Sequence, residues 1–288
     1  LIAGFMRFWD LGGRAIHPVN VRVGGFYRMP TRADLLALRP ALERGLEDAL
    51  AAVELVSGFD FPQMEQDYTY VSLRHPDYYP LERGVEVVAS SGVRFPVAEL
   101  PLHVQEFHVA HSNALHASFD GAPYFVGPLA RYTLNFDQLT PRCQEAAFAA
   151  GLTETCRNPF KSIIVRTVEL AYAFEEALRI IDEWTDGHAP SVPVSPRAGE
   201  GVGASEAPRG TIWHRYRIDD AGVIEDAQIV PPTSQNQSSI EMDLRTAAEQ
   251  WVDLDDHTLT HRCEAAIRNY DPCISCATHF LDLRVTRS

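Results

Sequence analysis

The strongest constraint on this chain is a short stretch near its C-terminal end, DPCISCATH at residues 271–279. Two residues separate Cys273 from Cys276, so a single turn can direct both sulfurs at a common point, with Asp271 before the pair and His279 after it. Thiolates select soft or borderline metals such as nickel, iron, copper and zinc. Because two thiolates rarely complete a metal site, the rest of the fold must bring further ligands to them.

Charge and composition limit the partners that this chain can have. The 288 residues include 25 basic and 39 acidic side chains, a net charge of −14. Nucleic acid and anionic membrane surfaces attract basic proteins, so neither is an expected partner. No apolar run reaches the ~18–20 residues that a membrane span needs. The 5 cysteines are an odd number in a large chain, which favours a reducing compartment such as the cytoplasm over a disulfide framework.

Periodicity predicts an α+β fold, mainly a helical bundle with small β-hairpins. Thr31 and Asp34 form a capping-box pattern, which predicts a helix that runs to about Val56. Alternating apolar residues predict two hairpins, and the second turns at DDAG, residues 219–222. The expected segments are an extended stretch at 68–73, hairpins at 85–97 and 211–230, helices at 141–184, 237–250 and 256–269, and a surface loop at 186–203 rich in Pro, Gly and Ser.

Two side-chain clusters invite closer interpretation. His103, His108, His111 and His116 lie close together in the sequence, and the spacing of His108 and His111 would place two imidazoles on one face of a helix. No acid or thiol accompanies them at a zinc-like spacing, so a metal site is not the favoured interpretation. In the long helix after residue 158, Arg166 and Glu169 stand three residues apart and are expected to pair.

Several phrases point, in order, to one family. They are GGRAIHP at residues 12–18, GPLAR at 127–131, APRG at 207–210, PTSQN at 232–236 and the terminal DPC-x-x-C-x-x-H. Together they resemble the large (alpha) subunits of nickel–iron hydrogenases, most closely the cytoplasmic types coupled to NAD(P)+. The last motif is specific, whereas the others are weak alone. The resemblance covers nearly all of residues 1–288, which implies one catalytic domain with the large-subunit fold.

The resemblance implies reversible cleavage of H2 at a nickel–iron centre. Cys273 would be a terminal nickel ligand, and Cys276 would bridge nickel to an iron that carries cyanide and carbon monoxide. Pro232 and Thr233 fall where the family packs on or hydrogen-bonds to a cyanide. His279 and the backbone carbonyl of Ile229 would bind Mg²⁺, a hard ion that prefers oxygen and water ligands.

A cation above the metals is the second implied feature. Arg209 would hold its guanidinium over the open metal position, with Asp271 as its carboxylate neighbour and Pro208 beside them. A fixed fork of donors there can orient the reaction and stabilise negative charge.

The resemblance also implies partners and missing parts. Electrons would leave through an iron–sulfur small subunit and then diaphorase-type subunits, because this chain has too few cysteines for a cluster of its own. The family supplies a second C-x-x-C and a glutamate upstream. The start at Leu1 leads us to expect that residues carrying them precede this sequence. Family members are usually cut just after the histidine, so residues 280–288 are expected to be a cleavable tail.

Other interpretations remain open on sequence grounds. A C-x-x-C can be a redox pair or half of a structural zinc site, here with His279 and Cys263. Arg209 could form an ordinary salt bridge. The chain could also be a non-catalytic electron-transfer scaffold related to the quinone-reducing respiratory subunit. Those scaffolds have lost the metal cysteines, so Cys273 and Cys276 argue against that role.

Overall fold

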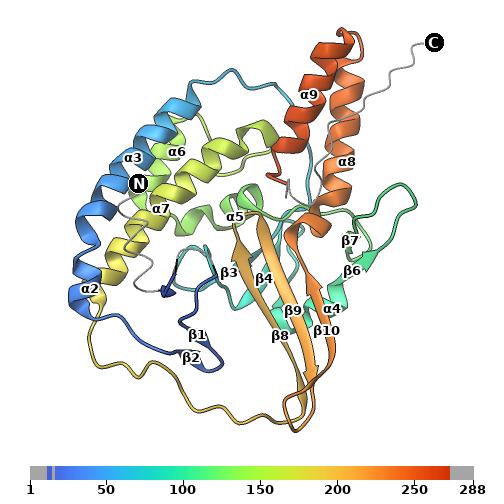
Figure 1. Ribbon diagram of the computed structural model, residues 1–288. Helices are drawn as coiled ribbons and strands as arrows, with labels where there is room; N and C mark the ends of the chain where they lie inside the picture. Colours follow the sequence, from blue (N-terminus) through green and yellow to red (C-terminus); the bar gives the residue numbers. More distant parts are fainter. Residues whose placement is uncertain (1–11, 15–16, 273–288) are drawn as a thin grey trace.

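The computed structural model describes residues 12–14 and 17–272. Cys273, Cys276, His279 and the expected tail at 280–288 therefore lie outside the described residues. In Figure 1 the long helices lie side by side on the left, a second helix pair stands at the upper right, and a three-stranded sheet projects downward between them. Among the described residues, none of the helices combines the length and the apolar character that crossing a bilayer would take.

The helical layer is built around two long helices that pack along each other. The capping box predicted at the start of the first helical segment is confirmed: the Asp34 backbone amide donates to Thr31 Oγ1, and the Thr31 amide donates to Asp34 Oδ2. Apolar residues of α3, α6 and α7 form the largest core cluster. The helices of this layer are α2 (Arg32–Leu36), α3 (Arg39–Ser57), α6 (Pro141–Ala149) and α7 (Ser162–Glu183).

The strands form small antiparallel sheets, so the predicted α+β class is confirmed. Both predicted hairpins are present, because β4 pairs with β5 and β9 pairs with β10. The strands are β1 (Val21–Arg22), β2 (Gly25–Phe26), β3 (Val71–Arg74), β4 (Glu86–Ala89), β5 (Arg94–Pro96), β6 (Val104–Phe107), β7 (His116–Phe119), β8 (Gly199–Ala207), β9 (Gly210–Ile218) and β10 (Ile224–Val230).

The surface loop expected at 186–203 ends earlier than predicted. Strand β8 begins at Gly199 and pairs with β9 along its whole length, from Gly199 opposite Ile218 to Ala207 opposite Gly210. The alternating glycines at its start have low strand propensity, and this composition led to the wrong prediction for 199–203. Hydrogen bonds to the neighbouring strand decide the conformation instead.

Further helices lie beside the sheets and contribute residues to the site. Helix α8 (Pro232–Trp251) begins five residues before the expected start at 237, with proline in its first turn, where the missing N–H costs nothing. It packs beside α9 (Asp256–Arg268), and Gly127 is the N-cap of α5 (Pro128–Asn135). The remaining short helices are η1 (Val97–Glu99), α4 (Leu100–His103), η2 (Phe136–Gln138) and η3 (Pro159–Lys161).

The predicted helical face carrying His108 and His111 is wrong. Both residues lie in the loop between β6 and β7, which form an antiparallel pair.

Candidate active site

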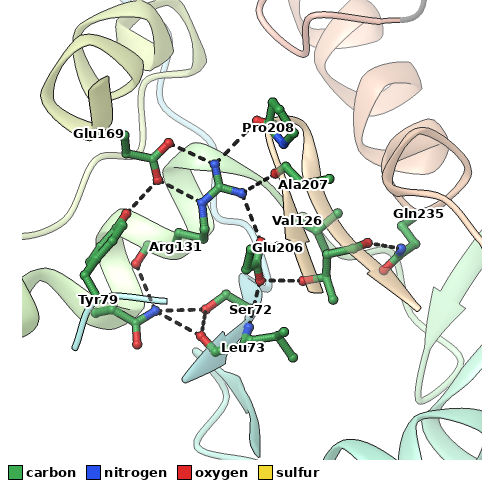
Figure 2. Close-up of polar contacts among 12 residues, drawn as sticks. Ser72, Leu73, Tyr79, Val126, Arg131, Glu169, Glu206, Ala207, Pro208 and Gln235 are labelled. Atoms are coloured by element: carbon green, nitrogen blue, oxygen red, sulfur yellow. Dashed lines mark hydrogen bonds and ion pairs between the residues drawn. The ribbon is translucent and has the colours of Figure 1, made fainter. Parts of the chain in front are cut away.

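A buried arginine joins two of the sequence motifs. Arg131, the last residue of GPLAR, makes a two-pronged contact with Glu169 of α7, with Nε 2.8 Å from Oε1 and Nη2 2.8 Å from Oε2. Its Nη1 also lies 2.9 Å from Oε2 of Glu206 in β8. Figure 2 shows the three side chains converging from three separate elements. Glu169 therefore pairs with Arg131, and the expected pair with Arg166 is wrong.

The charged groups of this cluster are buried, and each is stabilised by charged or hydrogen-bonding partners. Burial opposes the charge on Arg131, but Glu169 and Glu206 hold its pKa well above the ordinary value. Burial raises the pKa of Glu206, although Arg131 and hydrogen bonds from Leu73 and Thr211 oppose that effect. A buried charge left without such partners would be strongly destabilising.

The same arginine holds the turn that carries Arg209. Arg131 Nη1 donates to the carbonyl oxygen of Ala207 at 2.7 Å, and Nη2 donates to that of Pro208 at 3.4 Å. Gly127 lies on the other side of this turn with φ at +124°, and a Cβ there would be 2.8 Å from the carbonyl oxygen of Arg209. GPLAR and APRG are therefore packed directly against each other.

Arg209 and Asp271 meet at a pocket formed where α5, α7 and α9 approach this turn. Arg209 Nε lies 3.3 Å from Asp271 Oδ2 and also donates to the Asp271 backbone carbonyl. The residues that line the pocket are Phe125, Val126, Pro128, Leu129, Ser162, Arg166, Pro208, Arg209, Asn236, Asn269, Tyr270 and Asp271. The three residues for which sequence predicted one catalytic neighbourhood, Arg209, Asp271 and Pro208, thus share one pocket.

The pocket lining carries net positive charge. Its charged side chains are Arg166, Arg209 and Asp271, two guanidinium groups against one carboxylate. Arg166 donates to Ser162 Oγ at 3.0 Å and to the carbonyl of Asn269 at 3.4 Å, and within residues 12–14 and 17–272 it forms no ion pair. Burial lowers the pKa of Arg166, although the carboxylates of Asp271 and Glu169 oppose this effect.

One polar atom of the pocket has no hydrogen-bond partner in the described part of the chain. It is the side-chain amide nitrogen of Asn269, which is buried. Buried donors of this kind normally find an acceptor. Net positive charge together with an unpartnered donor fits a bound group that is anionic and accepts hydrogen bonds.

The other predicted cofactor and metal residues among those described, Pro232, Thr233 and Ile229, do not line the pocket. Pro232 is buried and Thr233 half-buried in the first turn of α8. Asn236 of the next turn fixes this helix start, because its side chain donates to the Val126 carbonyl and accepts from the Val126 amide, each at 2.8 Å. Ile229 lies in β10, paired with His214, and its side chain is half-exposed.

Sequence analysis missed a buried carboxylate behind the pocket. Asp243 of α8 accepts hydrogen bonds from Tyr68 at 2.6 and 2.7 Å and from Tyr270 at 2.8 Å. Burial raises the pKa of Asp243 to about 6, although both tyrosine hydroxyls oppose this. Tyr270 directly precedes Asp271, so this cluster anchors the chain entering the cysteine motif. The sequence feature that could have indicated this carboxylate is an acidic residue, Asp243, on the apolar face of the helix predicted at 237–250.

Cys263, the possible fourth ligand of a structural zinc, is fully buried within α9. Burial raises the pKa of its thiol, which disfavours the thiolate form that binds metals.

Comparison with known proteins agrees with this geometry. The family model described as nickel-dependent hydrogenase matches residues 110–279. The chain is 31% identical over 285 residues to sulfhydrogenase 1 subunit alpha of Pyrococcus furiosus, covering 95% of this chain and 64% of that protein. Sulfhydrogenase 2 subunit alpha of the same organism is 30% identical, over 95% of this chain and 64% of that protein. The chain therefore spans a little under two thirds of the length of these relatives.

Solved structures share the fold. An NAD+-reducing NiFe hydrogenase in the H2-reduced state superposes with a TM-score of 0.81 at 23% identity, over 96% of this chain and 66% of that one. The reduced Ni-Fe-Se hydrogenase of Desulfovibrio vulgaris Hildenborough gives a TM-score of 0.64 at 22% identity, over 94% and 66%. The family match covers GPLAR, APRG and the C-x-x-C motif of Cys273 and Cys276. In the structure, GPLAR and APRG lie together at the pocket that Asp271 borders. This chain belongs to the nickel-dependent hydrogenase family.

Proposed function

We propose that this chain acts in the catalytic large subunit of a nickel–iron hydrogenase, which cleaves H2 reversibly and heterolytically into protons and electrons. The observation that carries the proposal is the contact between Arg209 and Asp271, Nε to Oδ2 3.3 Å, in a positively charged pocket. Cys273 follows Asp271 by two residues in the sequence, so the described chain leads from this pocket directly into the C-x-x-C motif.

The metal ligands in this proposal come from the sequence. Cys273 and Cys276 would hold the nickel–iron centre, and Pro232 and Thr233 would contact its small ligands. His279 and the carbonyl of Ile229 would hold Mg²⁺. When bound, the nickel–iron centre with its cyanide and carbon monoxide ligands supplies the acceptor for hydride.

The residues that line the pocket would supply the fixed charges and hydrogen-bond donors for the reaction. Asp271 orients the Arg209 guanidinium, whose planar fork of donors suits fixed recognition of an anionic group. Arg166 adds a second, half-buried cation, and Asn269 a free amide donor. Donors held in place before the reaction stabilise developing negative charge without having to reorganise. Arg131 acts indirectly, because it holds the turn on which Arg209 stands.

The proposal includes partners and location. Electrons pass to an iron–sulfur small subunit and then to diaphorase-type subunits, as the likeness to an NAD+-reducing hydrogenase supports. A chain 36% identical over 167 residues, covering 54% of this one, is a subunit of an NAD-reducing hydrogenase of Cupriavidus necator. A nicotinamide-coupled enzyme of this type would work in the cytoplasm.

Metal analysis of the purified complex tests the proposal. We expect nickel and iron together, with infrared bands in the cyanide and carbon monoxide region. Zinc alone would indicate a structural site, and a complex without metal would indicate the non-catalytic scaffold; either result would contradict the proposal. The Cys276→Ser variant should lose H2 uptake and nickel. Cys156→Ser, a buried cysteine outside the motif, is the matched control and should retain both.

A further inference from the structure

Three side chains that do not line the proposed catalytic pocket converge on one point. His111 of the β6–β7 loop places Nε2 2.7 Å from Oε1 of Glu241, and His116 at the start of β7 places Nε2 3.0 Å from the same oxygen. One ligand-type atom from each residue lies within 4.8 Å of the others. Glu241 belongs to α8, so the cluster joins the loop to that helix.

The buried member of the cluster is held in one orientation. His116 is 2% exposed, and its ring lies 5.9 Å from those of both Phe107 and His111. Its Nδ1 faces the Ala114 carbonyl oxygen at 3.4 Å. A proton on Nδ1 satisfies this contact, which leaves the Nε2 lone pair facing a carboxylate oxygen. A proton on Nε2 or a metal ion between Nε2 and Glu241 removes the repulsion between these lone pairs, and the fixed ring presents Nε2 to either one.

This arrangement is the usual one for a metal-ligating histidine. Such residues generally donate the second ring N–H to a carbonyl or carboxylate, which fixes the ring and leaves the other nitrogen for the ion. The pair of His103 and Asp120 provides a contrast within the same hairpin, because there one imidazole meets one carboxylate at 2.8 Å. At Glu241 two imidazoles converge on one oxygen, so three potential ligand atoms from three residues surround one point, as a shared cation would require.

We propose that His111, His116 and Glu241 form a binding site for a divalent transition metal, with Zn²⁺ as the best-matched ion. Two imidazoles and one carboxylate are a known zinc ligand set, with Zn–N near 2.0–2.1 Å, and they leave a fourth position for water. The side chains of His111 and Glu241 are 66% and 44% exposed, so that position is open to solvent. With bonds of about 2.0–2.1 Å in tetrahedral geometry, ligand atoms lie about 3.3–3.4 Å apart, so both imidazole nitrogens must move away from the Glu241 oxygen when the ion enters.

The bound ion would fasten the β6–β7 loop to the helix that begins at Pro232 and Thr233. This site is independent of the proposed hydrogenase reaction, since it shares no residue with the catalytic pocket. Its effect is therefore expected on metal content and thermal stability, which can be measured without H2 turnover.

The test is metal titration of the purified complex, compared among variants. The wild type should bind one more Zn²⁺ per chain than His111→Ala or Glu241→Gln, or those variants should bind it more than about 100-fold more weakly, since loss of an outer-shell partner alone costs up to that factor. His108→Ala removes an exposed histidine of the same loop and should match the wild type. His111 is exposed, so its variant remains informative if the buried His116→Ala does not fold.

Cobalt substitution separates this site from the cysteine motif. Co²⁺ bound by imidazole and carboxylate should give visible d–d bands without a sulfur-to-metal charge-transfer band, and His111→Ala should remove the d–d signal. Equal Zn²⁺ stoichiometry and affinity in all variants, or a Co²⁺ spectrum unaffected by His111→Ala, would overturn the proposal whatever the H2 activity of the complex.

Discussion

Arg131 and Glu206 form an ion pair in which Nη1 lies 2.9 Å from Oε2, and the two side chains are 1% and 0% exposed. Glu169 contacts the same guanidinium from α7. One arginine therefore ties α5, α7 and β8 together and, through the Ala207 carbonyl, fixes the turn that presents Arg209. Arg131 therefore links the packing of these three elements to the position of the turn that carries Arg209.

Removal of that guanidinium should be costly. Arg131→Met leaves two buried carboxylates without their cation, and breaking such a buried pair typically costs about 3–5 kcal/mol. Urea denaturation should show this loss in the free energy of unfolding. Arg142→Met, which removes an exposed pair with Glu47, is the control and should change stability by about 0–1 kcal/mol. Similar losses in the two variants would contradict the central role of Arg131.

The close approach at Gly127 should not tolerate a side chain. Gly127→Ala would place Cβ 2.8 Å from the Arg209 carbonyl oxygen, which must shift the turn and lower both stability and H2 turnover. Gly121→Ala is the control, since φ is +80° there but nothing lies within 4 Å of the added Cβ. It should carry only the backbone cost of about 1–2 kcal/mol. Thermal unfolding and H2-uptake assays would distinguish the two; equal effects would show that the contact is unimportant.

Asp243 should make stability fall as pH rises. Its pKa is raised from 3.8 to about 6 by burial, so the folded protein holds a proton that the unfolded chain releases. The contribution is present below about pH 4 and is lost as the pH rises through about 6, a change on the order of 2–3 kcal/mol. The free energy of unfolding of the wild type, minus that of Asp243→Asn, should decrease over this range.

Asp137 provides a control of opposite sign. Hydrogen bonds from Arg74 lower the pKa of Asp137, so its contribution is present above pH 3.8 and is lost as the pH falls. The stability difference between the wild type and Asp137→Asn should therefore increase with pH. If both variants gave the same slope, burial would not be controlling the titration of Asp243.

Arg209→Lys should separate catalysis from folding. The Arg209 side chain is 40% exposed, so its replacement should change stability little, but lysine cannot reproduce the fork of donors. We expect H2 turnover to fall at least about tenfold, equivalent to about 1.4 kcal/mol of barrier, with nickel and iron still bound. Arg217→Lys removes a similar pair, Nε to Glu225 Oε2 at 3.3 Å, outside the pocket and should leave turnover unchanged. Full activity of Arg209→Lys would reject its proposed role.

The local elements and the order of the motifs could be predicted from the sequence alone. The capping box at Thr31, the hairpin around residues 219–222 and the start of α9 follow from short-range hydrogen bonding and side-chain alternation, which a few neighbouring residues specify. The expected proximity of Arg209 and Asp271 is also observed, whereas their catalytic role stays a prediction.

The pairing of charged groups between elements depends on how those elements pack. The spacing along the helix predicted an ion pair between Arg166 and Glu169. In the structure α5 packs against α7, and Glu169 pairs with Arg131 instead. A buried carboxylate is stabilised most by a guanidinium that donates two parallel hydrogen bonds to it. The convergence of His111 and His116 on Glu241, more than 100 residues away in the sequence, likewise depends on where α8 lies against the β6–β7 hairpin. Such contacts are set by the packing of whole elements, which local sequence patterns do not encode.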